Sequence, residues 1–219
     1  MAKLDIVGTG PGSPDFLTPI ARKTVRKANL VIGAQRTLNL FGDDIKSEKI
    51  VLNANNLSAS LKQAAQSIKL GRKVVILSTG DPGFSGLLHT VLESDLFNLA
   101  DINVIPGVSS VQACAAMLKI NWDTARLFTF HNKVSDEEKE KLISAVKCGR
   151  TILLLPNSKG FTPQDIAKFL VDLDTSKETP VYVCENITLE NEKITSTTLG
   201  QIMEHDFDSL CVMVIKGNC

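Results

Sequence analysis

The sequence has no excess of charge of either sign. Its 24 lysine and arginine residues balance 24 aspartate and glutamate residues, which gives a formal net charge of zero. A protein that binds nucleic acid or an anionic membrane through its overall charge carries a marked basic excess. The composition therefore gives no general reason to expect either partner.

Long apolar runs are also lacking. The longest ones have only the length of a β-strand, whereas a transmembrane helix needs about 20 apolar residues. The first expected strand, residues 3–7, begins almost at the start, and no charged segment followed by an apolar one precedes it. We therefore expect no membrane span, no signal peptide and a cytoplasmic location.

The cysteines do not indicate a disulfide framework. There are five, an odd number, far apart and mostly in apolar runs: Cys114, Cys148, Cys184, Cys211 and Cys219. Together with the three histidines they form no set with the spacing of metal ligands. We expect reduced thiols and no protein metal site.

What the chain does contain is a repeated order of strand, turn and helix. In the N-terminal half, apolar runs predict strands at residues 3–7, 30–32, 49–52, 73–78 and 101–105, with helices at residues 16–28, 35–40, 57–70, 84–93 and 109–118. This alternation is typical of a largely parallel sheet with helices on its faces.

From about residue 115 the pattern becomes richer in strands. Strands are expected at residues 126–130, 151–155, 181–185, 193–197 and 210–215, with helices at 136–146, 164–172 and 199–204. Strands that follow each other closely favour antiparallel pairing. We therefore expect an α/β protein with two domains, residues 1–114 with a largely parallel sheet and residues 115–219 with a mixed sheet, packed closely around a shared cleft.

Three glycine-containing turns follow three of the N-terminal strands, at residues 8–12, 80–83 and 106–110. The carboxyl ends of the strands form the edge at which open α/β sheets bind ligands. Glycine lets the backbone approach a ligand and adopt positive φ, and the helix N-termini beyond the turns offer N–H donors. Three such turns favour a small-molecule site.

Two common nucleotide motifs are absent. The third glycine of a dinucleotide fingerprint is replaced by Ser13, and no carboxylate follows between residues 16 and 42 to bind a ribose. No Gly-Lys-Ser/Thr follows a glycine turn, which excludes a P-loop. The acid-free stretch instead carries basic residues, namely Arg22, Lys23, Arg26, Lys27 and Arg36. The first four are spaced as one helical face, which we interpret as solvated.

Taken together, the turns resemble those of the tetrapyrrole methylase family. Gly8-Thr9-Gly10-Pro11-Gly12-Ser13-Pro14-Asp15, Gly80-Asp81-Pro82-Gly83-Phe84 and Pro106-Gly107-Val108-Ser109-Ser110 occur in the family's order and spacing. The resemblance covers essentially the whole chain. It implies two α/β domains with S-adenosylmethionine in the cleft between them, a homodimer, and methylation of a tetrapyrrole.

Within the family, the chain is similar to members that methylate C5 of a precorrin in cobalamin biosynthesis. The stretch Gly33-Ala34-Gln35-Arg36-Thr37-Leu38, Trp122 and His131 carry this similarity. The short chain resembles the standalone form, which implies the anaerobic branch and a separate C15-methylating, decarboxylating partner enzyme. The implied reaction converts cobalt-precorrin-7 to cobalt-precorrin-8, so any cobalt arrives with the substrate.

The resemblance also implies roles for individual residues. For the cofactor these are Pro11, Gly80, Asp81, Gly83, Phe84, Ser109, Ser110, Leu155 and Pro156. For the substrate they are Gly10, Arg36 and Trp122, and His131 is the candidate to orient the substrate or accept the C5 proton. Purely structural roles stay open: an Asx turn for Asp81, helix capping for the two serines, strand core for Leu155 and a structural histidine at 131.

Three other functions stay open at this point. In the first, the chain is a methylase of the same family whose acceptor is another ring carbon, a modified histidine of elongation factor 2, or ribosomal RNA. The balanced charge weighs against RNA. In the second, the chain is a non-enzymatic nucleotide-binding module. In the third, it is a nicotinamide oxidoreductase, which the missing ribose-binding acid disfavours.

Overall fold

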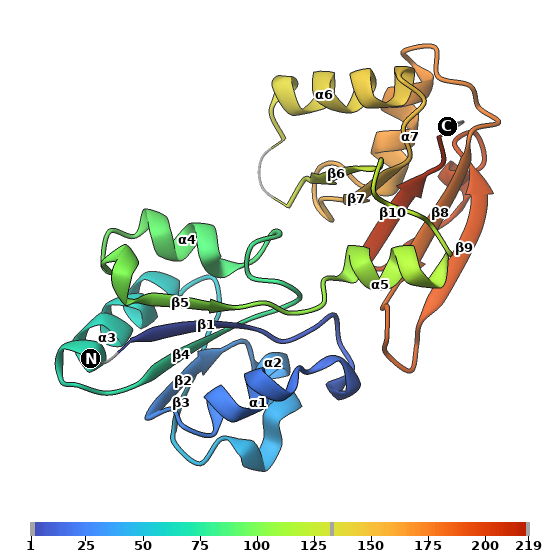
Figure 1. The fold of residues 1–219 in the computed structure, drawn as a ribbon. Coiled ribbons are helices and arrows are strands. Elements are labelled where there is room, and N and C mark those ends of the chain that lie inside the picture. Colours follow the sequence, from blue (N-terminus) through green and yellow to red (C-terminus); the bar gives the residue numbers. More distant parts are fainter. Residues whose placement is uncertain (1–2, 132–133, 218–219) are drawn as a thin grey trace. The chain divides into compact units, whose positions relative to one another are not determined.

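The computed structural model describes residues 3–131 and 134–217 and divides the chain into two compact units, Met1–Ser109 and Ser110–Cys219. Each unit contains its own five-stranded sheet (Figure 1). The boundary predicted from the sequence, after residue 114, lies inside the helix that opens the second unit. Within the described part of the chain, no helix is long and apolar enough to cross a membrane.

The first unit alternates strands and helices as its apolar pattern predicts. Among its described residues the α-helices and strands are β1 (Leu4–Gly8), α1 (Pro19–Val25), β2 (Leu30–Gly33), α2 (Gln35–Phe41), β3 (Glu48–Val51), α3 (Leu57–Lys69), β4 (Val74–Ser78), α4 (Leu87–Glu93) and β5 (Ile102–Ile105). Three 3-10 turns complete it, at Pro14–Phe16, Gly42–Asp44 and Leu99–Asp101.

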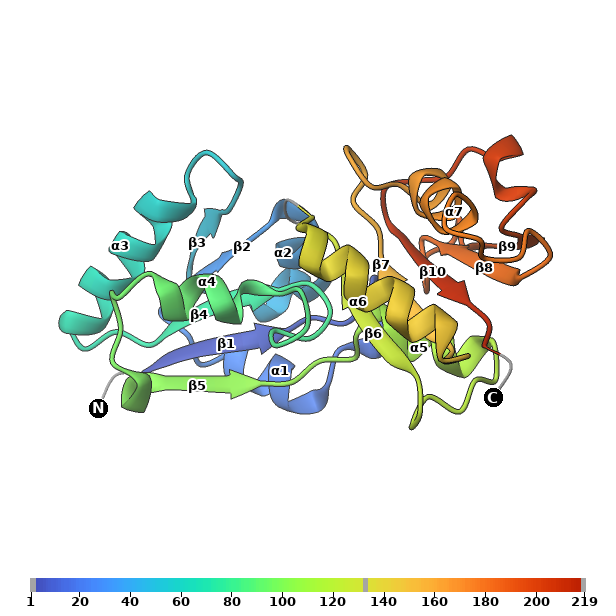
Figure 2. The same cartoon turned by 90° about the horizontal axis from the view of Figure 1, so that it is seen from above.

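All neighbouring strands of this sheet are parallel, in the order β3-β2-β4-β1-β5. The side chains alternate along the strands, so the sheet buries apolar groups on both faces. One face packs on α1 and α2, the other on α3 and α4 (Figures 1 and 2). The predicted parallel sheet with helices on its faces is confirmed.

Two of the predicted helices begin later than expected. The helix predicted from residue 16 begins at Pro19, because Thr18 accepts the Ala21 N–H as N-cap and the proline occupies the first turn. The helix predicted from residue 84 begins at Leu87, since Ser85 has a φ of 57°, outside the helical region.

In the second unit the sheet has a mixed strand order. Its elements among the described residues are α5 (Ser110–Met117), β6 (Arg126–Thr129), α6 (Asp136–Lys147), β7 (Ile152–Leu155), α7 (Pro163–Val171), β8 (Pro180–Glu185), β9 (Lys193–Thr198), a 3-10 turn (Ile202–Glu204) and β10 (Cys211–Ile215). The strand order is β6-β7-β10-β8-β9, and of the strand pairs that the structure describes here only β6–β7 is parallel. The predicted mixed sheet is confirmed, whereas the helix predicted at residues 199–204 is only the 3-10 turn.

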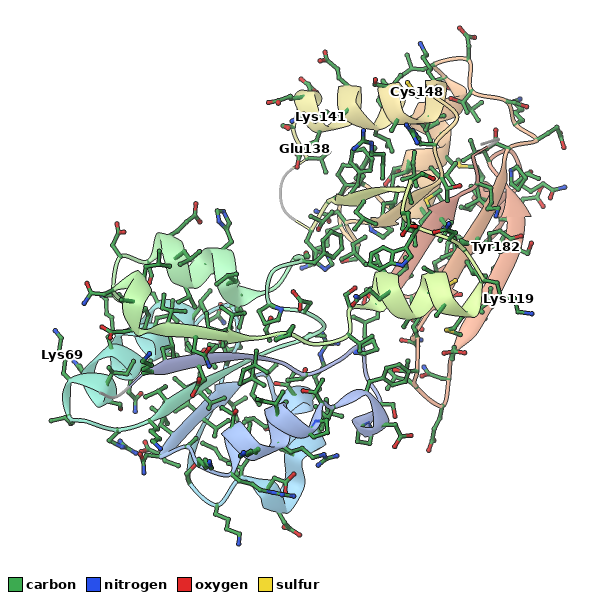
Figure 3. The ribbon with its side chains drawn as sticks, viewed as in Figure 1. Lys69, Lys119, Glu138, Lys141, Cys148 and Tyr182 are labelled. Carbon is green, nitrogen blue, oxygen red and sulfur yellow. The ribbon has the colours of Figure 1, made fainter. Side chains whose placement is uncertain are left out.

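Helices cover both faces of this second sheet. Capping boxes begin α6 at Ser135 and Glu138, and α7 at Thr162 and Asp165. These two helices pack on one face, around a core of large apolar side chains, and α5 packs against β7 and β10 on the opposite face. Figure 3 shows Glu138 at the beginning and Cys148 at the end of α6.

Candidate functional site

The three glycine turns meet because the strands before them are neighbours. β1 lies between β4 and β5, and all three run in parallel, so their carboxyl ends are adjacent. The Thr9 N–H donates to the Ser78 carbonyl at 2.9 Å, and the Gly80 N–H donates to the Gly10 carbonyl at 2.9 Å. Gly10 and Gly80 both have positive φ, 75° and 66°. The backbones of the first two turns are therefore joined directly.

Two glycines at this edge are required by the packing of the turns against each other. A Cβ on Gly107 would lie 2.4 Å from the Gly80 carbonyl oxygen, and a Cβ on Gly8 would lie 2.5 Å from the Gly107 nitrogen. From the sequence, these glycines were expected to let the backbone approach a ligand closely. For Gly8 and Gly107 the structure shows a close approach between turns, and these contacts join the turns at residues 8–12, 80–83 and 106–110 into one platform.

Asp81 links the second and third turns through its side chain. Its Oδ1 accepts the Gly83 N–H at 2.8 Å, which is the expected Asx turn, and its Oδ2 accepts the Gly107 N–H at 3.1 Å. The carboxylate is therefore engaged within the platform by two backbone donors. Of the residues assigned to the cofactor in this turn, Gly83 is exposed, Asp81 and Phe84 are half-buried, and Gly80 is buried.

A serine that the sequence analysis did not single out organises the end of the second turn. Ser78 is buried at the end of β4, and its Oγ accepts the Leu87 N–H at 3.1 Å, at the beginning of α4. A Cβ on Gly86 would lie 2.6 Å from the same oxygen. The sequence signal was a polar residue that closes the apolar run of residues 73–78.

Of the predicted substrate residues, Arg36 lies at this same edge. It is exposed near the start of α2, which follows β2, the neighbour of β4, and its Nη2 donates to Thr79 Oγ1 at 3.1 Å. Gly10 belongs to the first turn, and Pro11 beside it is half-buried. The structure therefore brings Arg36, Gly10, Pro11 and the second turn to one edge of the first sheet.

The other arginines of the basic stretch are used within the first unit. Arg22 Nη1 and Arg26 Nε each lie 2.8 Å from an oxygen of Asp44, just beyond the acid-free stretch. The hydrogen bonds from these two guanidinium groups hold the pKa of Asp44 below its ordinary value. The two ion pairs with Asp44 partly neutralise the basic face of α1. Arg36 is therefore the better candidate to bind a substrate carboxylate.

Ser109 and Ser110 follow the third turn at the end of one unit and the start of the next. Ser109 is buried and Ser110 is the first residue of α5. A Cβ on Gly80 would lie 3.6 Å from the Ser109 Cα, so the second turn packs against this serine. The predicted cofactor residues of the first unit, with Ser109, therefore form one contiguous group.

The remaining predicted residues belong to the second unit. His131 is exposed just beyond β6, and Leu155 and Pro156 are buried at the end of β7. The two strands are parallel neighbours, the Phe130 N–H donates to the Leu155 carbonyl at 2.9 Å, and Asn157 Nδ2 donates to the His131 carbonyl at 3.4 Å. These three residues therefore share one edge of the second sheet. Trp122, 38% exposed, lies before β6.

A hollow of about 180 Å³ opens at that edge. Its walls combine polar and apolar groups from the segment after β7, the beginning of α7, the segment before β10 and the first residue of β10: Pro156, Ser158, Thr162, Pro163, Gln164, Asp206, Phe207, Asp208, Ser209 and Cys211. Pro156 is the one predicted cofactor residue among them. Sequence reasoning missed the segment at residues 206–209, because it has no motif and its role depends on the strand order.

The cysteines of the described residues form no metal cluster, and no other group of potential ligands does so there. Cys114, Cys184 and Cys211 are buried and free, Cys148 is exposed, and Cys219 lies outside the described residues. The hydrogen bond with Cys184 and burial raise the pKa of the Cys114 thiol, and burial raises the pKa of Cys211 to about 12. The thiolate form is therefore disfavoured at Cys114 and Cys211, whereas the hydrogen bond with Cys114 lowers the pKa of the Cys184 thiol.

Comparison with known proteins agrees with this architecture. The sequence profile of the tetrapyrrole (corrin/porphyrin) methylases matches residues 3–203. A Methanocaldococcus jannaschii protein named as a probable cobalt-precorrin-7 C(5)-methyltransferase is 41% identical over 214 residues, 97% of each chain. The cobalt-precorrin-4 C(11)-methyltransferase of the same organism is 31% identical over 212 residues, 92% of this chain and 81% of its own.

The fold is also similar to that of a solved enzyme. The structure of a cobalt precorrin-4 methyltransferase matches with a TM-score of 0.83 at 26% identity, over 98% of this chain and 94% of that one. Since the profile and these relatives span most of the sequence, the chain belongs to the tetrapyrrole (corrin/porphyrin) methylase family, whose members are methyltransferases that use S-adenosylmethionine.

Proposed function

We propose that the protein methylates C5 of cobalt-precorrin-7 to give cobalt-precorrin-8, in the anaerobic branch of cobalamin biosynthesis. The observation that carries this proposal is the 41% identity, over 97% of both chains, to the relative named for that reaction. The stretch around Arg36, Trp122 and His131 supports it, because these residues resemble the C5-methylating members of the family.

The platform formed by the three turns supports binding of the cofactor there. The second turn leaves Gly83 exposed, and a Cβ there would meet no atom closer than Asp81 Oδ1 at 3.2 Å. We assign cofactor binding to Pro11, Gly80, Asp81, Gly83, Phe84, Ser109 and Ser110 in this region, and to Leu155 and Pro156 at the edge of the second sheet. S-adenosylmethionine, when bound, supplies an electrophilic methyl group on a sulfonium sulfur.

The chain's own residues have positioning and proton-handling roles. The reduced tetrapyrrole provides an enamine-like carbon nucleophile, so alignment of the two reactants supplies much of the rate. Arg36 binds a substrate carboxylate as a charge-assisted pair, and Gly10 and Trp122 contact the macrocycle. His131, at the exposed end of β6, accepts the proton that leaves C5 after the methyl group has been added.

The test is an anaerobic incubation with cobalt-precorrin-7 and S-adenosylmethionine carrying a ¹³C-methyl group. We expect one added methyl by mass spectrometry and its position at C5 by NMR. His131→Gln should lower the turnover number by roughly 100-fold if the histidine accepts the proton, and His89→Gln, another exposed histidine, should not. Absence of methyl transfer to cobalt-precorrin-7 by folded protein that binds S-adenosylhomocysteine refutes the assignment.

A second acceptor deserves the same assay. The 31% identity to a cobalt-precorrin-4 C(11)-methyltransferase favours C11 methylation as the alternative activity. Cobalt-precorrin-4 is therefore offered in parallel, and a methyl group on C11 of this substrate would replace the C5 assignment.

We further propose that the enzyme acts as a cytoplasmic homodimer and passes its product to a separate C15-methylating, decarboxylating enzyme. The support is the match to the relative named for C5 methylation, which covers 97% of that relative's length. Light scattering coupled to size-exclusion chromatography tests the dimer, and a single-chain mass under assay conditions contradicts it.

A further inference from the structure

Glu185 is a buried carboxylate at the end of β8. Among residues 3–131 and 134–217 it is the only carboxylate in the buried class, at 4% exposure. Removing a carboxylate from water is unfavourable unless hydrogen bonds or an opposite charge compensate. A carboxylate retained in such a place therefore needs an explanation in its contacts.

Those contacts lead to one segment, residues 206–210. Glu185 Oε1 accepts the Asp208 N–H at 2.8 Å, and the neighbouring Asn186 Nδ2 donates to Asp208 Oδ2 at 2.5 Å. The Asn186 N–H also donates to the Leu210 carbonyl at 2.9 Å. Three hydrogen bonds thus tie the segment before β10 to the end of β8.

The second oxygen of Glu185 is poorly compensated. Oε2 has no hydrogen-bond partner within the described part of the chain, and the exposed Lys193 Nζ lies 3.5 Å from it, opposite on β9. The backbone that follows is strained, because Asn186 and the β-branched Thr188 have φ of 50° and 70°. Such strain and an under-paired buried charge are kept where a geometry matters for function.

The segment held by Glu185 forms a wall of the hollow that also contains Pro156. Asp206, Phe207, Asp208 and Ser209 all line it. β10 begins beside the end of β7, because the two strands are antiparallel neighbours. Loss of the Glu185 bond would remove one of the three hydrogen bonds that hold this wall, and would leave the opposite wall, at Pro156, in place.

We propose that Glu185 is a positioning residue: through Asp208 it fixes the segment at residues 206–210 and so sets the affinity for the adenosyl cofactor in the hollow. This inference rests on the proposed function, which assigns Pro156 to that cofactor. Glu185 makes no contact with reacting atoms in this role, so it acts on the KM for S-adenosylmethionine and leaves the turnover number nearly unchanged.

The experiment compares four variants by calorimetric titration of S-adenosylhomocysteine. Glu185→Ala removes the acceptor of the Asp208 N–H and should weaken binding at least about tenfold, or 1.4 kcal/mol. Glu185→Gln keeps an oxygen acceptor and should stay within about threefold of the unchanged protein. Asn186→Gly removes the side-chain bond to Asp208 but tolerates the positive φ, and should weaken binding by an intermediate factor.

The matched control is Val183→Ala in the same strand. Val183 is fully buried, so its truncation lowers the stability of the second unit without touching Asp208. We expect a lower melting temperature and unchanged affinity at a temperature where the variant is folded. With saturating cofactor, Glu185→Ala should keep its turnover number within about twofold while its KM rises in parallel with the dissociation constant.

The outcomes separate the two proposals. If the unchanged protein does not bind S-adenosylhomocysteine, the proposed function fails. If it binds, and folded Glu185→Ala binds equally well, the positioning role is overturned; it is also overturned if Glu185→Gln is as weak as Glu185→Ala. If Glu185→Ala does not fold, Glu185→Gln is compared with Asn186→Gly. The proposal is supported if Glu185→Gln binds with nearly the affinity of the unchanged protein and Asn186→Gly binds more weakly. It is overturned if the two variants bind with equal affinity.

Discussion

Asp81 joins two turns, and removing its carboxylate tests whether this link is structural. Its two oxygens accept the Gly83 N–H at 2.8 Å, in an exposed bond, and the Gly107 N–H at 3.1 Å, in a partly buried one. A hydrogen bond to a charged group contributes about 1.5–3 kcal/mol when buried, and less when water competes. We therefore expect Asp81→Ala to lower the free energy of unfolding by about 2–3 kcal/mol.

The conservative variant separates the two bonds. Asp81→Asn keeps one oxygen for the Gly83 N–H but turns an amide NH₂ toward the Gly107 N–H. We expect it to lose about 1–2 kcal/mol, because one donor is left without its acceptor. Asp43→Ala, an exposed carboxylate of the same unit, is the control and should change stability by less than about 0.5 kcal/mol.

The assay uses urea denaturation followed by two probes. Far-UV circular dichroism reports on both units, whereas the single tryptophan, Trp122, lies in the second unit. The dichroism transition must shift for the Asp81 variants, and a tryptophan transition that does not shift would assign the loss to the first unit. Equal stability of Asp81→Ala, Asp81→Asn and the unchanged protein would refute the view that this side chain holds the turns together.

Three further predictions concern packing, charge and thiol reactivity. Gly107→Ala should destabilise the first unit by about 1–3 kcal/mol and weaken S-adenosylhomocysteine binding, because its Cβ would lie 2.4 Å from the Gly80 carbonyl oxygen. Thermal melts and calorimetry measure the two effects, and a variant with unchanged stability and affinity contradicts the packing argument. Asp44→Asn should lower stability by about 1 kcal/mol at pH 7. Because the pKa of Asp44 is depressed in the folded state, this difference should be fully present above the ordinary aspartate pKa and be lost as the pH falls through the lower pKa of the folded protein. Thermal melts across a pH series measure it, and a pH-independent difference would contradict the ion pair. In a Cys219→Ser background, a thiol reagent should label Cys148 first and reach the buried thiols only on unfolding, and Cys148→Ser should abolish the fast phase.

Local sequence determined the elements and much of the turn chemistry. The apolar run of residues 73–78 predicts a buried strand, and the structure has β4 at Val74–Ser78. The Asx turn at Asp81 follows from an aspartate before proline and glycine. Such features depend on a few consecutive residues, so periodicity and turn preferences are sufficient to predict them. The two late helix starts were missed because Thr18 capping and the φ of Ser85 override the apolar pattern.

The family resemblance came from three motifs in order, and the order is a property of the sequence alone. How the motifs fit together is not. The bond from the Gly107 N–H to Asp81 joins residues 26 positions apart, and it exists because β1 lies between β4 and β5. No local pattern specifies that strand order, so the sequence could suggest a ligand near the glycines but not that Gly8 and Gly107 touch each other.

In the second unit, tertiary structure decided even more. The family resemblance predicted a role for Pro156, but the segment at residues 206–209 carries no motif. In the sequence, Glu185 is simply the last residue of a predicted strand. They belong together only because β10 pairs antiparallel with both β7 and β8. Sequence sets which residues are apolar, which turns are possible and which family the chain resembles. The strand order determines which side chains meet, because hydrogen bonds and steric contacts between distant residues form only after the sheet is assembled.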